Sequence, residues 1–187
     1  MRKTLLFAIA VLIARGPAAA AGPLDTPVVQ VSEAKGVYSV SARFTVPETP
    51  ADVLAVLTDY ARIPRFMPGI RTSVVRERAD GRAVVEQEAV SKLMMFSKRV
   101  HLVLQVEEQS DGITFHDRCG KSFTQYAGSW RVTRTANVTT IVYELMADPT
   151  FDVPEFMLKR LLRRDSGEMI EQLQREVSRR AAIRASR

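Results

Sequence analysis

The sequence predicts an α+β domain: a curved antiparallel sheet packed against one long C-terminal helix, with two short helices after the first strand. Between residues 70 and 146, apolar and polar residues alternate in short runs separated by turn sequences, which is typical of antiparallel strands with one buried face. From residue 154 onward, apolar residues instead recur every three or four positions, as in an amphipathic helix. The length of 187 residues and the hydrophobic content of 46% fit one globular domain.

The first 21 residues have the organisation of a secretory signal peptide. Arg2 and Lys3 precede an apolar stretch over residues 4–14, a Gly-Pro pair interrupts it, and four alanines at 18–21 supply small residues for cleavage. The stretch is shorter than the roughly 20 residues that a transmembrane anchor needs. We therefore expect residues 22–187 to form a periplasmic or secreted domain; an N-terminal core helix or an uncleaved anchor is the alternative.

The charge and cysteine content exclude several classes of function. Removal of the signal peptide takes away Arg2, Lys3 and Arg15, which lowers the formal net charge from +6 to +3. This mild balance gives no support for a nucleic-acid partner. Cys119 is the single cysteine, so we expect neither an internal disulfide nor a cysteine-based zinc site.

The N-terminal part of the domain predicts a strand pair. Residues 38–46 alternate between an apolar face that starts at Tyr38 and a polar face that starts at Ser39. Residues 28–34 can pair with this strand through a turn at Lys35-Gly36. One face of the pair is therefore expected to be buried and the other solvated.

Two short helices are expected next. Residues 50–57 predict a helix with Thr49 as its N-cap. Pro64 and Pro68 bracket a shorter helical turn around Phe66 and Met67.

Six further strands are expected, at residues 71–77, 82–90, 95–108, 113–118, 122–135 and 138–146. Turn sequences at residues 79–81, 110–112 and 119–120 separate several of them. Tyr126, Gly128, Trp130 and Val132 share an apolar face, and we expect Gly128 to mark a bulge or a sharp bend.

The C-terminal segment predicts the helix that covers the sheet. Asp152 is expected to cap it, with Pro154 in its first turn and Glu155 following. The helix would run to about Ile183, a length of roughly 45 Å. Its apolar stripe consists of Leu158, Leu161, Leu162, Met169, Ile170, Leu173 and Val177.

Several of these segments resemble one known family. They are residues 38–47, 53–60, 63–68 and 128–132, together with the helix from Pro154. The chain resembles the START-like (SRPBCC) superfamily over about residues 28–180, in its polyketide cyclase/dehydrase and coenzyme Q-binding branch. The resemblance implies the helix-grip fold, with a hydrophobic cavity between the sheet and the C-terminal helix. The superfamily includes lipid carriers, quinone binders, cyclases and hormone receptors, so the fold alone does not fix the function.

Large apolar residues on the elements around such a cavity are the candidate ligand-binding residues. They are Phe66, Met67, Trp130, Tyr143, Met157, Leu161 and Met169. Tyr143 or Trp130 could donate one orienting hydrogen bond. Methionines such as Met94 and Met95 could adapt to a variable apolar ligand or simply fill the core. Gly167, inside the helix, could leave room for a ligand, bend the helix or allow close packing on the sheet.

We predict no catalytic residue, no metal site and no cofactor. His101 and His116 lack metal-binding spacing, and both are expected at the surface. Cys119 lies in a predicted turn, where we expect it to be unreactive. Glu86 and Glu88 share a strand face and could form an acid/base pair, although carboxylates on a strand face are usually solvated.

These observations predict an exported, non-enzymatic binder of a hydrophobic small molecule or lipid. The resemblance makes an isoprenoid quinone or a phospholipid the candidate ligand. One alternative is a cyclase- or dehydratase-like enzyme that uses Tyr143 or Glu86 as its acid or base. Another is a partner-binding protein whose own side chains fill the core. From residue 155 onward there are nine Lys/Arg and five Asp/Glu, so the helix could contact anionic membranes transiently or merely present a solvated face.

Overall fold

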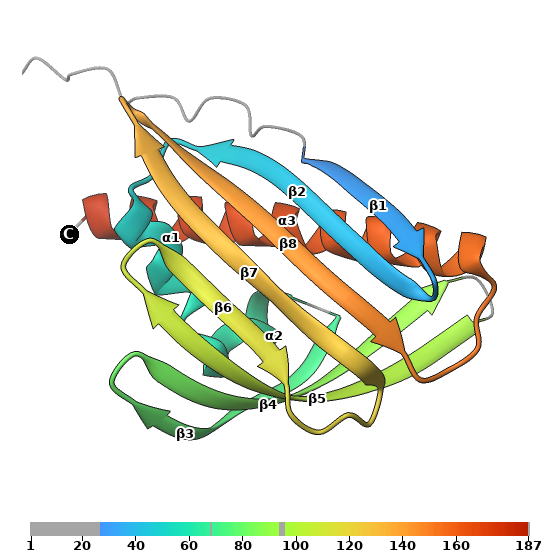
Figure 1. Cartoon of the computed structure of the whole chain (residues 1–187). Helices are drawn as coiled ribbons and strands as arrows, with labels where there is room; N and C mark the ends of the chain where they lie inside the picture. The colour runs from blue at the N-terminus through green and yellow to red at the C-terminus, as the bar shows by residue number, and fades with distance from the viewer. Residues whose placement is uncertain (1–26, 68, 94–95, 187) are drawn as a thin grey trace, which may run out of the picture.

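The computed structural model describes residues 27–67, 69–93 and 96–186, and these form an eight-stranded antiparallel sheet with one long helix running across it (Figure 1). The strand order is β1-β2-β8-β7-β6-β5-β4-β3. The predicted α+β architecture is confirmed. The expected signal peptide, Pro68, Met94 and Met95 lie outside the described residues.

The elements follow the predicted order, with boundaries shifted by a few residues. The strands are β1 (Val28–Ala34), β2 (Val37–Val46), β3 (Ile70–Ala79), β4 (Arg82–Leu93), β5 (Phe96–Gln109), β6 (Gly112–Asp117), β7 (Phe123–Thr135) and β8 (Val138–Pro149). The helices are α1 (Pro50–Leu57), the 3-10 turn η1 (Tyr60–Arg62), α2 (Ile63–Phe66) and α3 (Glu155–Ala185).

The β1–β2 hairpin forms as its sequence predicts. Lys35 and Gly36 have φ values of 54° and 85°, the left-handed geometry of a tight hairpin turn, which glycine adopts without strain. The inward side chains of β2, namely Tyr38, Val40, Ala42, Phe44 and Val46, are all buried. The other neighbour of β2 is β8. The chain must therefore cross to the opposite edge of the sheet, where β3 lies, and α1, η1 and α2 make that crossing.

Helix α1 starts at the predicted cap. The Thr49 hydroxyl accepts a hydrogen bond from the Asp52 N–H at 3.3 Å, and the Asp52 carboxylate accepts one from the Thr49 N–H at 3.0 Å. This reciprocal capping box satisfies two N–H groups that a helix start leaves open. The helix then buries Val53, Val56 and Leu57 against the core.

Gly128 does not mark the predicted bulge. Strand β7 pairs regularly with β8 from Gln125 to Thr135, and the irregularity lies between Phe123 and Gln125. A Cβ atom at position 128 would lie 2.4 Å from the Glu144 carbonyl oxygen and 2.6 Å from the Phe115 ring. Glycine is needed here because neighbouring groups approach the backbone too closely for any side chain.

Helix α3 begins one residue after Pro154, and the predicted Asp152 cap is wrong. Pro154 occupies the N-cap position with an extended ψ of 131°, and no side chain among the described residues caps the helix. The helix then continues for 31 residues, about 46 Å. Leu158, Leu161 and five further members of the predicted apolar stripe pack against the cores under the sheet. No helix in the described part of the chain is long and apolar enough to cross a membrane.

Candidate functional site

A cavity of about 640 Å³ lies between the inner face of the sheet and α3. Strands β4, β5, β7 and β8 supply most of its wall, α1, η1 and α2 line one side, and α3 covers it. Its volume falls in the range of small-molecule and cofactor sites. The alternative that the protein fills its core with its own side chains is therefore wrong.

Six of the seven predicted residues line this cavity: Phe66, Met67, Trp130, Tyr143, Leu161 and Met169. Met157 does not. It packs instead against a smaller cluster formed by Tyr38, Leu158 and Leu161 beside the first turns of α3. Contact with a ligand remains a prediction for all seven residues.

The sequence reasoning missed much of the wall that β4 and β5 contribute. Val85, Gln87 and Ala89 on β4 line the cavity, and so do Val100 and Leu102 on β5. Ala89 pairs directly with Val100, so the two face the cavity from neighbouring strands. The alternation of apolar and polar residues in both strands could have identified these lining residues, because every second residue of a strand lies on the same face.

Gln87 places an amide group between Val85 and Ala89 on the inner face of β4. Its side chain is only 8% exposed, and its Nε2 donates a hydrogen bond to the Ser73 hydroxyl at 3.1 Å. Ser73 is buried as well, so the two polar side chains satisfy each other within the wall.

Tyr143 brings a hydroxyl group to the cavity lining. Its ring lies 4.4 Å from that of Trp130, measured between ring centres, and the Trp130 ring in turn meets Phe44 edge-on. Burial raises the pKa of Tyr143 well above 10, so the hydroxyl stays protonated at neutral pH. It makes no hydrogen bond with any residue that the structure describes, which leaves it able to donate one to a ligand.

Tyr126 is a second protonated tyrosine in the lining. Burial, reinforced by the nearby carboxylate of Asp117, raises the pKa of Tyr126 to about 12. Its ring packs against Phe123 and Phe115, with centre distances of 4.8 and 6.1 Å. The cavity thus combines a large apolar surface with a few neutral polar groups.

Charged side chains form part of the cavity lining. Arg164 and Glu168 come from α3, while Arg71 and Lys98 come from the starts of β3 and β5. Arg164 is paired with Glu168 at 3.7 Å, and it also contacts Asp165. Arg71 and Lys98 form no ion pair within residues 27–67, 69–93 and 96–186, although the Lys98 ammonium lies 4.2 Å from the centre of the Phe151 ring. Arg71 and Lys98 therefore bring positive charge to the lining that no described acidic residue pairs with.

Gly167 does not line the cavity. A Cβ atom at this position would meet only Val29 of β1, at 4.0 Å, an ordinary van der Waals distance. The expectation that its missing side chain makes room for a ligand is therefore wrong. Close helix–sheet contact does not require glycine here either, because that distance accommodates a methyl group.

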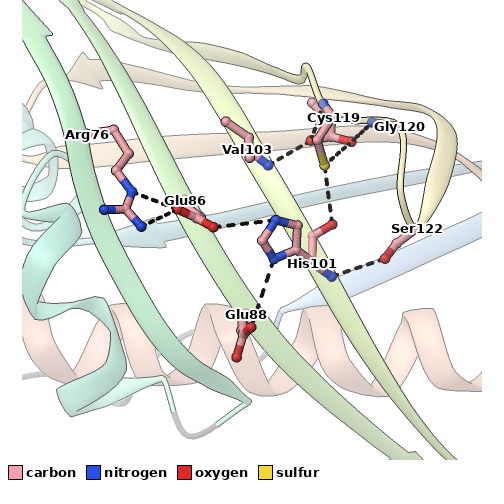
Figure 2. Close-up of polar contacts among 9 residues, drawn as sticks. Arg76, Glu86, Glu88, His101, Val103, Cys119, Gly120 and Ser122 are labelled. Carbon is pink, nitrogen blue, oxygen red and sulfur yellow. Dashed lines mark hydrogen bonds and ion pairs between the residues drawn. The ribbon is translucent and has the colours of Figure 1, made fainter.

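Glu86, the other acid/base candidate, lies on the outer face of the sheet (Figure 2). Its carboxylate accepts a 2.6 Å hydrogen bond from Arg76 and lies 3.5 Å from His101 Nε2. The Arg76 hydrogen bond holds the pKa of Glu86 below its ordinary value. Glu88 flanks the same imidazole at 4.0 Å. Neither carboxylate lines the cavity, so neither can act on a molecule held there, and the predicted solvent-side position of His101 is confirmed.

Cys119 belongs to a turn that Asp117 organises. The Asp117 carboxylate accepts hydrogen bonds from the N–H groups of Val103, Cys119 and Gly120 at 2.8–3.3 Å. The Cys119 sulfur lies 3.5 Å from the same carboxylate and 3.7 Å from the His101 carbonyl oxygen (Figure 2). His116 is exposed, as predicted. Among the described residues, no group of three His, Cys, Asp or Glu side chains could hold a metal ion.

Comparison with known proteins identifies a family and a fold. The family model described as polyketide cyclase/dehydrase and lipid transport matches residues 38–178. No curated protein matches the chain.

Three solved structures illustrate the likeness in fold. The Zhui aromatase/cyclase from Streptomyces sp. R1128 is 17% identical, with a TM-score of 0.66 over 78% of this chain and 96% of that one. A START superfamily protein from Mycobacterium smegmatis is 18% identical, with a TM-score of 0.64 over 75% and 97%. A STAR-related lipid transfer protein from Xanthomonas axonopodis is 16% identical, with a TM-score of 0.59 over 82% and 99%. These likenesses confirm the helix-grip fold.

Proposed function

The chain belongs to the polyketide cyclase/dehydrase and lipid transport family, and we propose that it is an exported protein that binds an isoprenoid quinone or a phospholipid. The observation that carries the proposal is the apolar cavity of about 640 Å³ between the sheet and α3. Transfer of apolar surface from water into such a cavity stabilises a complex by about 25 cal/mol per Å². An acyl or isoprenoid chain supplies that surface.

The two candidate ligands would use different polar groups of the site. A quinone carbonyl can accept a hydrogen bond from the Tyr143 hydroxyl, which has no partner among the described residues. A phospholipid would instead place its phosphate near Arg71 and Lys98 in the lining. Both would bury their chains against the inner faces of β4 and β5.

A cyclase- or dehydratase-like activity is the second candidate, and Tyr143 is the residue that favours it. A buried hydroxyl in the lining can donate a hydrogen bond to a substrate carbonyl and polarise it. The raised pKa of Tyr143 argues against a role as a base at neutral pH, because the tyrosinate form is then scarcely populated. An enzyme of this kind would therefore use Tyr143 as a donor.

Export and membrane contact complete the proposal. Export rests on the signal-peptide organisation of residues 1–21. Most basic side chains of α3 are already engaged, including Lys159 with Glu155 and Arg175 with Glu171. Arg160 and Arg163 form no ion pair in the described part of the chain, and we propose that they make the transient contact with anionic membranes.

Native mass spectrometry of protein purified gently from its own host, followed by organic extraction, tests the proposed function. We expect a lipid or quinone to co-purify at close to one molecule per chain. An empty protein that also fails to take up added quinones and phospholipids would contradict binding. A bound molecule that loses water during incubation would instead support the dehydratase alternative.

Replacement of Ala89 by Trp should block the cavity and abolish most uptake. Ala89 lines the cavity from β4, so an indole at this position occupies space that the ligand needs. Ala127→Trp is the matched control, because Ala127 is not part of the cavity lining and Tyr126 and Gly128 flank it on the opposite, inner face of β7. Equal uptake by the two variants would show that the ligand binds elsewhere; unfolding curves establish that both remain folded.

A further inference from the structure

A second, smaller pocket lies between α2 and the C-terminal half of α3. Its volume is about 200 Å³, and it is lined by Arg62, Arg65, Phe66, Glu176, Arg179 and Arg180. Four of these six side chains are arginines, contributed by two parts of the chain that are distant in sequence. We call it the arginine pocket.

Glu176 fixes the two arginines on the α3 side. Its carboxylate accepts 2.7 Å hydrogen bonds from Nε and Nη2 of Arg179 and from Nε of Arg180. The Glu176 side chain is only 8% exposed, and the Arg179 hydrogen bonds hold its pKa at about 2. Both guanidinium groups are therefore held in place at neutral pH, while Nη1 of Arg179 and Nη2 of Arg180 make no hydrogen bond with described residues.

Arg62 and Arg65 bring two more positive charges to the opposite wall. Arg62 lies 3.6 Å from Asp59, whose carboxylate also forms an ion pair with Arg180 at 2.8 Å. Arg65 has neither a hydrogen bond nor an ion pair within the residues that the structure describes, and its side chain is exposed. Four guanidinium groups thus share two carboxylates, Glu176 and Asp59, which leaves two positive charges without a counter-charge.

Phe66 forms the floor between this pocket and the large cavity. It lines both, and the Arg180 guanidinium lies over its ring at 5.9 Å. The ring separates the arginines from the apolar interior, and it orients Arg180 by a cation–π contact. An anion in the arginine pocket would therefore lie outside the large cavity. It would still contact α2, the helix that also lines the large cavity.

We propose that the arginine pocket is a binding site for a phosphate group, carried either by a lipid head group or by a soluble phosphorylated molecule. Guanidinium groups suit phosphate because their planar N–H donors match its oxygens in pairs. A phosphate monoester at neutral pH carries close to two negative charges, which matches the two positive charges of the pocket that have no counter-charge. The site needs no occupant in the large cavity, so it stands independently of the quinone or phospholipid proposed there.

Titration calorimetry with inorganic phosphate tests the site directly. The Arg62→Gln/Arg65→Gln double variant should weaken phosphate binding at least about tenfold, because each lost charge-assisted hydrogen bond contributes measurably to affinity. Arg175→Gln is the control: it removes one positive charge from α3, where Arg175 pairs with Glu171 outside the pocket. The cavity-blocking Ala89→Trp variant should keep its phosphate affinity, which separates this site from the proposed cavity function.

Vesicles of phosphatidylcholine with and without phosphatidic acid distinguish the two sources of phosphate. Binding that needs phosphatidic acid and is lost in Arg62→Gln/Arg65→Gln assigns the site to a lipid head group. Binding of inorganic phosphate with vesicle binding unchanged in that variant assigns it to a soluble phosphorylated molecule. Equal losses in Arg175→Gln and in the double variant, or binding of neither probe by the wild-type protein, would overturn the proposal.

Discussion

The two halves of α3 form one continuous helix in different surroundings. Residues 155–169 run beside the cavity, where Leu161 and Met169 form part of its lining. Residues 170–185 lie mainly over the closed core: Gln172 and Leu173 still reach the cavity lining, but Ile170 and Val177 are outside it and at most 1% exposed. The first half borders the large cavity, whereas the second half packs mainly against buried side chains of the core.

Polar contacts follow the same division. In the second half, Ser178 donates a 2.6 Å hydrogen bond to Glu48, Arg180 pairs with Asp59, and Arg184 pairs with Asp52. These contacts join α3 to the start of α1 and to η1, far away in the sequence. In the first half, the ion pairs Lys159–Glu155 and Arg164–Glu168 join residues of α3 itself. The difference indicates that the C-terminal half anchors the helix and that the N-terminal half can adjust to a ligand.

Adjacent substitutions at the junction of the two halves test this division. Ile170→Ala should lower the free energy of unfolding by about 3 kcal/mol, because Ile170 is completely buried and its removal leaves a void. Met169→Ala should cost only about 1 kcal/mol, because Met169 already borders the cavity and loses fewer contacts. Urea unfolding measures both.

The same pair also separates stability from binding. Met169→Ala should change the affinity for an added quinone or phospholipid more than Ile170→Ala does, provided that both variants are assayed well below their unfolding transitions. If the two substitutions cost the same stability, the cavity end of α3 is packed as tightly as the anchored end, and the proposed division fails.

Glu176→Gln tests the anchored half through its pH dependence. Hydrogen bonds from Arg179 and Arg180 lower the pKa of Glu176 from 4.5 to about 2. A carboxylate with a lowered native pKa stabilises the fold fully above its unfolded pKa, and this contribution is lost as the pH falls from about 4.5 to 2. After allowance for the solvent exposure of Arg179, we expect the variant to lose about 1–2 kcal/mol at pH 7.

The stability of the wild type and the variant should therefore converge as the pH approaches 2. Glu171→Gln serves as the control, because Glu171 is on the same helix but half exposed, with a 3.3 Å ion pair to Arg175. Urea unfolding at pH 7 and at several values below 4.5 gives the comparison. A constant difference in the free energy of unfolding between wild type and Glu176→Gln over this range would show that the carboxylate charge does not contribute to stability.

The fold was largely predictable because its local signals agree with the tertiary structure. Alternation located all eight strands, and Thr49 and the Lys35-Gly36 turn mark the start of α1 and the first hairpin. The predicted boundaries are wrong where tertiary contacts or backbone geometry decide where a strand or helix ends or begins. Strand β8 continues past Met146 to Pro149 because Asp148 and Pro149 still pair with β7. Asp152 resembles a cap in sequence, but the extended backbone of Pro154 starts the helix later.

The site was predictable only where family resemblance and periodicity act together. Six residues of the cavity lining were identified from their size and their element, whereas Met157 is not part of the lining. The arginine pocket left no local pattern, because Arg62 and Arg65 meet Arg179 and Arg180 only after α2 has packed beside α3. Their sequence spacing carries no information about that contact.

Gly167→Ala tests the smallest difference between the two halves. Glycine inside a helix costs about 1 kcal/mol relative to alanine, and a methyl group here meets only Val29 at 4.0 Å. We therefore expect Gly167→Ala to raise the free energy of unfolding by about 0.5–1 kcal/mol in urea unfolding. Ligand uptake should not change, because position 167 lies on the β1 side of α3 and outside the cavity lining. A stabilised variant with reduced uptake would show instead that the ligand-facing half of α3 needs the flexibility that glycine provides.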